Sequence, residues 1–319
     1  MERFGFVGLP NAGKSSLYNA LSGGSALAAP YAFATKEPNV GMAKVLDSRL
    51  DRLAEMSASK NVIPATVQFV DIGGLVEGAS TGEGLGNKFL ANIREADAIV
   101  FVLRAFVDVD VPGSSDPLDH LRIVETELAL ADLETVETQI DKRRKAAKQD
   151  KSIADEVAAL GKAHELLAEG TPLYRSDLDG ESRELIRSYF LLTNKPVLAI
   201  VNVGEDDLDR IDELAAPVVA ELGDHGEVIG MCVQLEAEAA QLDLDERAEM
   251  LEGLGLGEGA LPRFLQTAYR MLGLRTFFTT GEKESRAWTF YQGSTAPVAP
   301  VGSTPTSSAA SSRPRSSRS

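Results

Sequence analysis

The stretch "FGFVGLPNAGKSSLYNAL", residues 4–21, decides the fold. It begins as a short apolar run of the β type, passes through a glycine-rich turn and continues in a helical pattern. The turn fits the pattern G-x-x-x-x-G-K-[ST] with Gly8, Gly13, Lys14 and Ser15. Because a strand precedes the turn and a helix follows it, we interpret the stretch as a phosphate-binding loop rather than a turn that binds nothing.

The residues of this loop have predicted roles toward a nucleoside triphosphate. The glycines let backbone N–H groups turn toward the phosphates, and the helix N-terminus adds a partial positive charge. Lys14 is expected to reach the β- and γ-phosphates, and the Ser15 hydroxyl to bind magnesium. The predicted nucleotide-binding residues of the loop are Asn11, Ala12, Gly13, Lys14, Ser15 and Ser16.

Two further segments are predicted to act on magnesium and the γ-phosphate. Asp71 ends the strand "VQFVD" and opens "DIGG", so its carboxylate can hold magnesium through water while the Gly74 N–H faces the γ-phosphate. Thr35 in "YAFATKEPNVG" stands on a loop where a threonine can complete the magnesium shell, although it also fits a plain solvent-exposed residue. The predicted catalytic residues are Lys14, Thr35, Asp71 and Gly74, and the predicted metal ligands are Ser15, Thr35 and Asp71.

Apolar β-type runs recur along the chain and alternate with helical stretches. They are "FGFVG", "VQFVD", "AIVFVLR", "VLAIVN" and "EVIGMCV". Such alternation predicts a mostly parallel sheet with helices on both faces, that is, an α/β fold of the P-loop NTPase type. One segment breaks the alternation: residues 118–170 read as two long helices that form an inserted antiparallel hairpin. Apolar residues at spacings of mostly three and four mark these helices: Leu121, Val124, Leu128, Leu133, Val136 and Ile140, then Ile153, Val157, Leu160 and Leu167.

The end of the chain has a different character. "RTFFTTGEKESRAWTFY", residues 275–291, predicts a β-hairpin. The tail has no aromatic or large aliphatic residue after Val301, so we expect it to be disordered. The predicted division is a nucleotide-binding domain in two parts (1–117 and 191–275), a helical insertion (118–190), an incomplete C-terminal domain (276–300) and a tail (301–319).

Composition limits the class of protein. The single cysteine excludes an internal disulfide, the N-terminus has no signal-peptide pattern, and the longest apolar runs are far shorter than the ~20 residues that span a bilayer. We therefore expect a cytosolic protein with no membrane partner. A net charge of −16 excludes coating of nucleic acid by overall electrostatics. A local basic patch is needed for RNA contact, and "DKRRKAAKQDKS" at the hairpin tip offers Lys142, Arg143, Arg144, Lys145, Lys148 and Lys151, which also fit a solvated turn.

The segment "AIVNVGED", residues 199–206, bears on the base of the nucleotide. It resembles the Asn-Lys-x-Asp with which GTPases read guanine, but Glu205 is one methylene longer than Asp. An Asp carboxylate accepts the N1–H and 2-amino groups of guanine together, whereas adenine presents a lone pair at N1. Lengthening the side chain spoils the guanine pairing. We predict that Asn202, Val203 and Glu205 form a base-binding site that either prefers adenine or discriminates weakly between the purines. In this site Asn202 contacts the N7 edge of the base. Backbone groups near Val203 or in "MCVQL" accept a hydrogen bond from the N6 amino group.

The motifs together resemble one family. "GLPNAGKSSLYNAL", "FATKEPNVG", "DIGGLVEGASTGEGLGNKFLANIREADAIV", "ETELALADLETVE" and "RAWT" are similar to the Obg-like ATPases, the YchF proteins, over about residues 1–300. The resemblance implies a P-loop domain, a helical insertion and a C-terminal TGS (β-grasp) domain. It also implies hydrolysis of ATP to ADP and phosphate in preference to GTP, with Mg²⁺, and binding to the ribosome, where we expect the large subunit and ribosomal RNA to be contacted.

The hydrolytic step leaves alternatives open. The position after D-x-x-G, where Ras-like enzymes place a water-orienting Gln, holds Leu75. The substrate, another residue or a partner must then position the water. The family has a histidine in the loop before the insertion, but this chain has none there before His120, so that role is not assigned. Asn11 stands where related switches hold K⁺, so K⁺ is a second expected cofactor. A GTP-hydrolysing switch and a scaffold that nucleotide merely orders are the competing functions.

The tail raises a separate hypothesis. A lone hairpin is marginal in water, so residues 276–300 should not close a β-grasp core by themselves. The tail is either naturally disordered or the product of a frame shift near Pro300, because an alternative frame through "VGSTPTSSAASSRPRSSRS" permits a string with the apolar pattern of strands. Sequencing the gene across the codon for Pro300 distinguishes the two.

Overall fold

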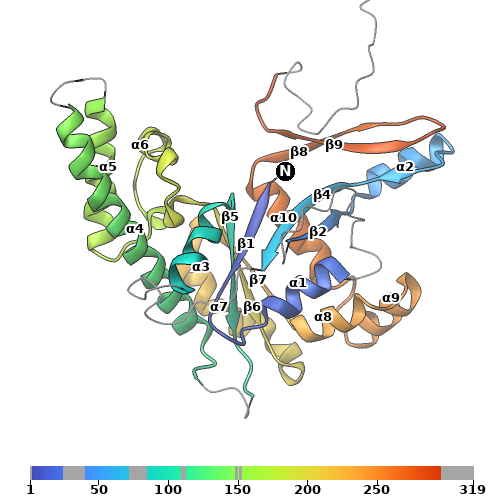
Figure 1. The fold of residues 1–319 in the computed structure, drawn as a ribbon. Coiled ribbons are helices and arrows are strands. Elements are labelled where there is room, and N and C mark those ends of the chain that lie inside the picture. Colours follow the sequence, from blue (N-terminus) through green and yellow to red (C-terminus); the bar gives the residue numbers. More distant parts are fainter. Residues whose placement is uncertain are drawn as a thin grey trace, which may run out of the picture.

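A six-stranded sheet forms the centre of the molecule, in the order β2-β4-β1-β5-β6-β7 (Figure 1). The structure, a computed structural model, describes residues 2–23, 40–71, 85–108, 113–147, 150 and 153–295. All strands run parallel except β2, which pairs antiparallel with β4, so the predicted α/β fold with a mostly parallel sheet is confirmed. The strands are β1 (Arg3–Val7), β2 (Val40–Val45), β4 (Ala65–Asp71), β5 (Ala98–Arg104), β6 (Val197–Asn202) and β7 (Gly226–Met231).

The central strands are buried on both faces, which explains their continuous apolar runs. Every residue of β5 and β6 is buried. Along β5, Val100 and Val102 join the core on one face of the sheet, and Phe101 and Leu103 join the core on the other. The strand β2 was not predicted, because the buried positions on this edge strand alternate and include Gly41 and Ala43, which form no apolar run.

Helices cover both faces of the sheet (Figure 1). One core cluster joins the sheet to α1, α8 and α10, and a second joins it to α3, the start of α4, and α7. Two further helices, α2 and α9, lie at the periphery (Figure 1). The bounds are α1 (Lys14–Gly23), α2 (Ser48–Met56), α3 (Leu85–Arg94), α4 (Pro117–Ala147), α7 (Ile211–Leu222), α8 (Val233–Ala239), α9 (Leu244–Gly253) and α10 (Leu261–Met271).

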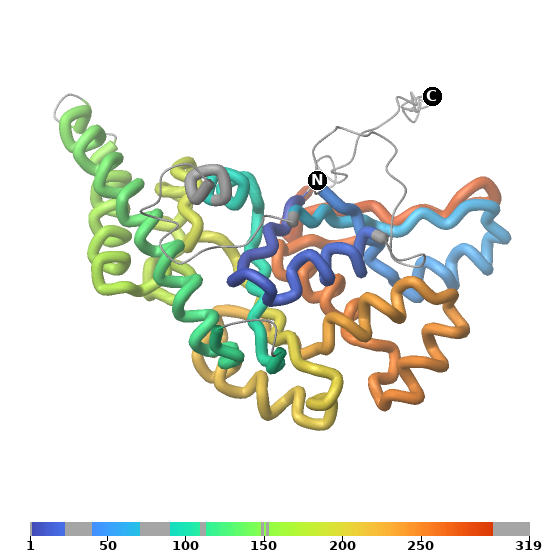
Figure 2. The backbone as a smooth tube through the Cα atoms, turned by 60° about the horizontal axis from the view of Figure 1, so that its bottom comes forward, coloured from blue at the N-terminus to red at the C-terminus, as the bar shows by residue number. Residues whose placement is uncertain are grey.

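The predicted helical hairpin is confirmed. It consists of α4 and α5 (Ala154–Ala168), which stand away from the sheet (Figure 2). A third core cluster lies between them and includes Val136 of α4 and Leu160 of α5. The short helix α6 (Gly180–Leu185) lies beside α5. The basic segment lies at the hairpin tip as expected, but its first part is helical and does not form a connection between the helices. The helix α4 continues to Ala147, so Lys142, Arg143, Arg144 and Lys145 lie in its last turns, whereas Lys148 and Lys151 are outside the described residues.

The C-terminal strands form a second sheet with an early segment of the chain. The hairpin of β8 (Leu274–Thr279) and β9 (Ser285–Tyr291) forms as predicted. It is not alone, however, because β3 (Val62–Ile63) pairs parallel with β9 and gives the order β3-β9-β8. The expectation of an unsupported hairpin was therefore wrong. A strand of two residues leaves no recognisable pattern in the sequence.

Several predictions are not tested by this architecture. Residues 296–319, including the tail and the frame near Pro300, lie outside the described residues. The domain boundaries stay a prediction. Among the helices that the structure describes, none has the length and apolar character required to cross a bilayer.

Candidate nucleotide-binding cleft

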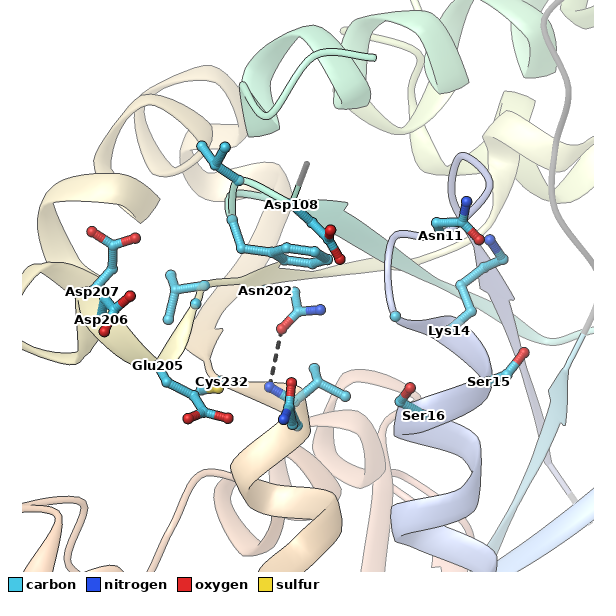
Figure 3. Close-up of a pocket in the computed structure, with 17 residues that line it drawn as sticks. Asn11, Lys14, Ser15, Ser16, Asp108, Asn202, Glu205, Asp206, Asp207 and Cys232 are labelled. Atoms are coloured by element: carbon cyan, nitrogen blue, oxygen red, sulfur yellow. Dashed lines mark hydrogen bonds between the residues drawn. The ribbon is translucent and has the colours of Figure 1, made fainter. Parts of the chain in front are cut away.

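A cleft of about 860 Å³ opens at the carboxyl ends of β1, β5 and β6 (Figure 3). The strand order reverses next to β1, and a reversal of this kind places ligand sites at the carboxyl edge of an open α/β sheet. The volume is within the range of small-molecule sites. The lining residues are Asn11, Gly13, Lys14, Ser15, Ser16, Phe106, Val107, Asp108, Asn202, Val203, Gly204, Glu205, Asp206, Asp207, Cys232, Val233 and Gln234.

The phosphate end of the cleft is built from backbone. The loop between β1 and α1 has left-handed conformations at Asn11 (φ 59°) and Gly13 (φ 103°), which turn successive N–H groups toward one side. Because α1 begins at Lys14, the positive end of its dipole faces the cleft. A Cβ on Gly13 would lie 2.3 Å from Asn202 Nδ2, so the loop can approach β6 this closely only with glycine.

Lys14 is held at the mouth of this loop. Its side chain is 5% exposed, and its Nζ donates hydrogen bonds to the carbonyl oxygens of Gly8 (3.0 Å) and Leu9 (2.7 Å). These contacts keep the ammonium group within the loop that the sequence assigns to phosphates. The arrangement suits a cation that interacts with the charge of a bound triphosphate.

Asn202 joins the two ends of the cleft. It is the last residue of β6 and is 5% exposed. Its Nδ2 donates to the Ala12 carbonyl (3.0 Å), and its Oδ1 accepts from the Val233 N–H (3.0 Å), so one amide links the phosphate loop, β6 and α8. The predicted contact with a purine must therefore use the second N–H or the second lone pair of this amide.

The base end also contains Val203 and Glu205. The Val203 N–H donates to the Met231 carbonyl (3.0 Å), which leaves the Val203 carbonyl as its available backbone group. Glu205 begins the 3₁₀ helix η5 (Glu205–Arg210) and is exposed. Figure 3 places its carboxylate beside Cys232. Burial raises the pKa of the Cys232 thiol, and the charge of Glu205 acts in the same direction, so a neutral thiol lines this end.

Sequence reasoning missed the segment Phe106–Asp108, which follows β5 and lines the opposite wall. The Phe106 Cβ lies 3.4 Å from where a Cβ on Gly204 would be, so this ring belongs to the base end. Buried Arg104 fixes it: Nε donates to the Phe106 carbonyl (2.9 Å), and the guanidinium lies 5.0 Å from the ring centroid. The adjacency of β5 and β6 in a parallel sheet was the available signal, because it brings both strand ends to one edge.

The predicted magnesium ligands are only partly described. Asp71 ends β4 opposite Phe6, which places its backbone beside the start of the phosphate loop. Ser15 lines the cleft in the first turn of α1. A serine hydroxyl and a carboxylate from the neighbouring strand form an oxygen donor set that fits Mg²⁺. The Asp71 side chain, Thr35, Gly74 and Leu75 lie outside the described residues, and the remainder contains no group of three His, Cys, Asp or Glu that could hold a metal.

His120 lies outside the cleft. It is 3% exposed in the first turn of α4, where its Nε2 donates to the Ser114 carbonyl (2.7 Å). Burial lowers the pKa of its imidazole, which therefore stays neutral at physiological pH.

The first part of the chain matches a known protein family. Residues 3–111 match the family described as "50S ribosome-binding GTPase". This segment begins at β1 and ends shortly after β5 in the sequence. It therefore includes the phosphate loop and the newly identified wall of the cleft.

Longer similarity extends over most of the chain. The chain is 46% identical over 305 residues to the Ribosome-binding ATPase YchF of Haemophilus influenzae and 43% identical over 306 residues to that of Bacillus subtilis. Each alignment covers 92% of this chain and 82% of the relative. The solved structure of the Schizosaccharomyces pombe YchF GTPase matches 93% of this chain with a TM-score of 0.80 at 35% identity. The names of these proteins differ in the nucleotide they indicate: the bacterial proteins are called ATPases and the yeast protein a GTPase.

Proposed function

The chain belongs to the YchF family of ribosome-binding nucleoside triphosphatases, and from that premise we propose that it is a magnesium-dependent ATPase that binds the ribosome as a nucleotide-regulated switch. The reaction is hydrolysis of ATP to ADP and phosphate. The observation that carries the proposal is that one continuous cleft joins a phosphate loop at one end to Asn202 and Glu205 at the other.

The preference for ATP rests on the base end. A guanine reader needs a carboxylate fixed against the N1–H and 2-amino groups. Glu205 is exposed, and its carboxylate lies toward Cys232. The Val203 carbonyl can accept from the adenine N6 amino group, and the neutral Cys232 thiol does not repel the base. These features support adenine over guanine.

The chemistry of the phosphate end follows from charge. Lys14 and the first turn of α1 stabilise negative charge on the transferred phosphoryl group. Ser15, Thr35 and Asp71 would hold magnesium, which neutralises charge on the β- and γ-phosphate oxygens when it is bound. The Gly74 N–H is proposed to contact the γ-phosphate. Because Leu75 cannot orient water, we expect slow basal turnover.

Ribosome contact is proposed through the end of α4. Lys142, Arg144 and Lys145 are exposed there and can reach RNA phosphates on the large subunit. Arg143 differs from them, because its Nε donates to the Tyr189 hydroxyl (2.7 Å) and lies 3.2 Å from a Glu156 oxygen. We therefore assign Arg143 to the packing of the hairpin and the other three to RNA.

Hydrolysis of GTP is the second candidate, and it is favoured by the matched family and the yeast relative, both of which are described as GTPases. The test is competition of ATP and GTP against a fluorescent nucleotide, measured with and without purified ribosomes. We expect ATP to compete at lower concentration in both conditions. A clear preference for GTP in both would contradict the assignment to ATP and leave the family membership intact.

A further inference from the structure

We propose that Asp108 recognises the ribose: its carboxylate accepts hydrogen bonds from the 2′- and 3′-hydroxyls of the nucleotide and makes the cleft selective for ribonucleotides. This inference rests on the proposed function in one respect, since it takes a nucleoside triphosphate as the ligand. It does not depend on which purine is bound.

The position of Asp108 along the cleft carries the first step. The phosphates belong at the N-terminus of α1 and the base at Asn202, so the sugar must lie between them. Asp108 is two residues beyond Phe106, whose side chain packs against Gly204 at the base end. Two residues span at most about 7 Å, which reaches from a base to its sugar. Figure 3 shows the Asp108 carboxylate projecting into the space between Asn202 and the phosphate-loop residues Asn11 and Lys14.

The other carboxylates that line the cleft are placed differently. Glu205 lies beside Cys232, and Asp206 and Asp207 lie farther out along η5 (Figure 3). Asp207 also pairs with Arg210, with Oδ1 and Nη1 3.1 Å apart. Within the lining residues, Asp108 is therefore the carboxylate that faces the middle of the cleft.

The chemistry of a carboxylate selects the sugar as its partner. An ionised Asp only accepts hydrogen bonds, so it cannot pair with phosphate oxygens and would repel them. A ribose presents two O–H donors on adjacent carbons, which can bond the two carboxylate oxygens together. An acidic side chain at a strand end serves this purpose for the 2′-hydroxyl in dinucleotide-binding α/β folds. A contact of this kind explains why a cleft that must accept a negatively charged triphosphate has the carboxylate of Asp108 at its centre.

Calorimetric titration of the full chain with ATP, 2′-deoxy-ATP and 3′-deoxy-ATP tests the proposal without a label on the sugar. We expect the unmodified protein to bind ATP about tenfold more tightly than either deoxy analogue, as for a hydrogen bond to a charged group near solvent. In Asp108→Asn and Asp108→Ala, ATP should bind more weakly and lose this tenfold advantage over the deoxy analogues. Asp209→Asn, an exposed carboxylate of η5 outside the cleft lining, should keep the tenfold ratio.

Three results would overturn the assignment. They are equal binding of ATP and its deoxy analogues by the unmodified protein, retention of the ratio in Asp108→Ala, and an equal gain of affinity for all three ligands in that variant, which would mean that the carboxylate only repels phosphate. Repeating the titrations with GTP and 2′-deoxy-GTP separates this proposal from the proposed function. A protein that prefers GTP contradicts the ATPase assignment, whereas loss of the ribose ratio on both bases contradicts the role of Asp108.

Discussion

The two ends of the cleft are built in different ways. The phosphate end is one continuous stretch of sequence between β1 and α1, and it is formed largely by the backbone of that stretch. The base end is assembled from the carboxyl ends of β5 and β6 and the start of α8, segments that are far apart in the sequence. Backbone recognition suits a phosphate that every nucleotide shares. Discrimination between bases and sugars falls to side chains, which can change one at a time.

The largest effect is expected at Lys14. Lys14→Ala removes a charge that stabilises the transferred phosphoryl group, so turnover should fall by about 10²-fold or more. The hydrolysis rate at saturating ATP is the measurement, with exposed Lys60→Ala as the control. Unchanged turnover would contradict the assigned role. Ribosome binding and cellular effects that survive in Lys14→Ala would favour the scaffold hypothesis.

Gly13→Ala tests whether the two ends depend on each other. The new methyl group would meet Asn202 Nδ2 at 2.3 Å in a left-handed conformation, so both the phosphate loop and the base reader should be displaced. We expect the free energy of unfolding in urea to fall by about 2–4 kcal/mol, from strain and overpacking together, with weaker binding of ATP.

Gly170→Ala is the matched control for Gly13→Ala. Gly170 is also left-handed (φ 78°), but a Cβ there meets nothing within 4 Å. Its substitution should cost only about 1 kcal/mol and leave nucleotide binding unchanged. Equal losses of stability in the two variants would mean that the contact with Asn202 adds nothing beyond backbone strain.

Glu205→Asp sharpens the comparison at the base end alone. Shortening the side chain restores the Asn-x-x-Asp spacing, so the ratio of GTP to ATP affinity should rise by about tenfold, which corresponds to ~1.4 kcal/mol. Competition binding gives the ratio directly. Asp209→Glu changes length by the same methylene outside the cleft and should leave the ratio alone. If the ratio in Glu205→Asp does not move, Glu205 does not read the base.

The smallest effect is expected from the monovalent cation. If Asn11 helps to hold K⁺ against the phosphates, replacing K⁺ by Na⁺ should slow turnover a fewfold. Asn11→Ala should remove that difference, so that the rates of the variant in K⁺ and Na⁺ become equal. Identical rates of the unmodified protein in the two salts would exclude K⁺ as a cofactor.

Site residues that belong to a local sequence motif could be predicted from the sequence. Site residues that reach the cleft through the pairing of neighbouring strands could not. Gly8, Gly13 and Lys14 follow a fixed spacing between a strand and a helix, so their site could be read directly. Asn202 was found because a buried strand precedes it. Phe106 and Asp108 carry no motif, and their position in the cleft follows only from the pairing of β5 with β6.

The errors in the fold have physical reasons of the same kind. The basic residues 142–145 were expected between the two helices of the hairpin, yet Lys and Arg are good helix formers and α4 continues through them. The segment β3 is a strand because it pairs with β9, and its own two residues carry no recognisable strand pattern. In both cases the relevant property lay outside the pattern of apolar residues.

The pairing of β3 with β9 has a consequence for the synthesis of the protein. Ser59 and Ser285, whose hydroxyl oxygens are 2.8 Å apart beside this pairing, are separated by 226 positions. At about 5–20 residues per second, roughly ten to forty-five seconds pass between the emergence of the first segment and that of its partner. During that interval Val62 and Ile63 have no strand to pair with. The second sheet is therefore the last part of the described chain to assemble, and an interruption of translation before residue 285 leaves the early segment open to a chaperone or to a neighbouring nascent chain.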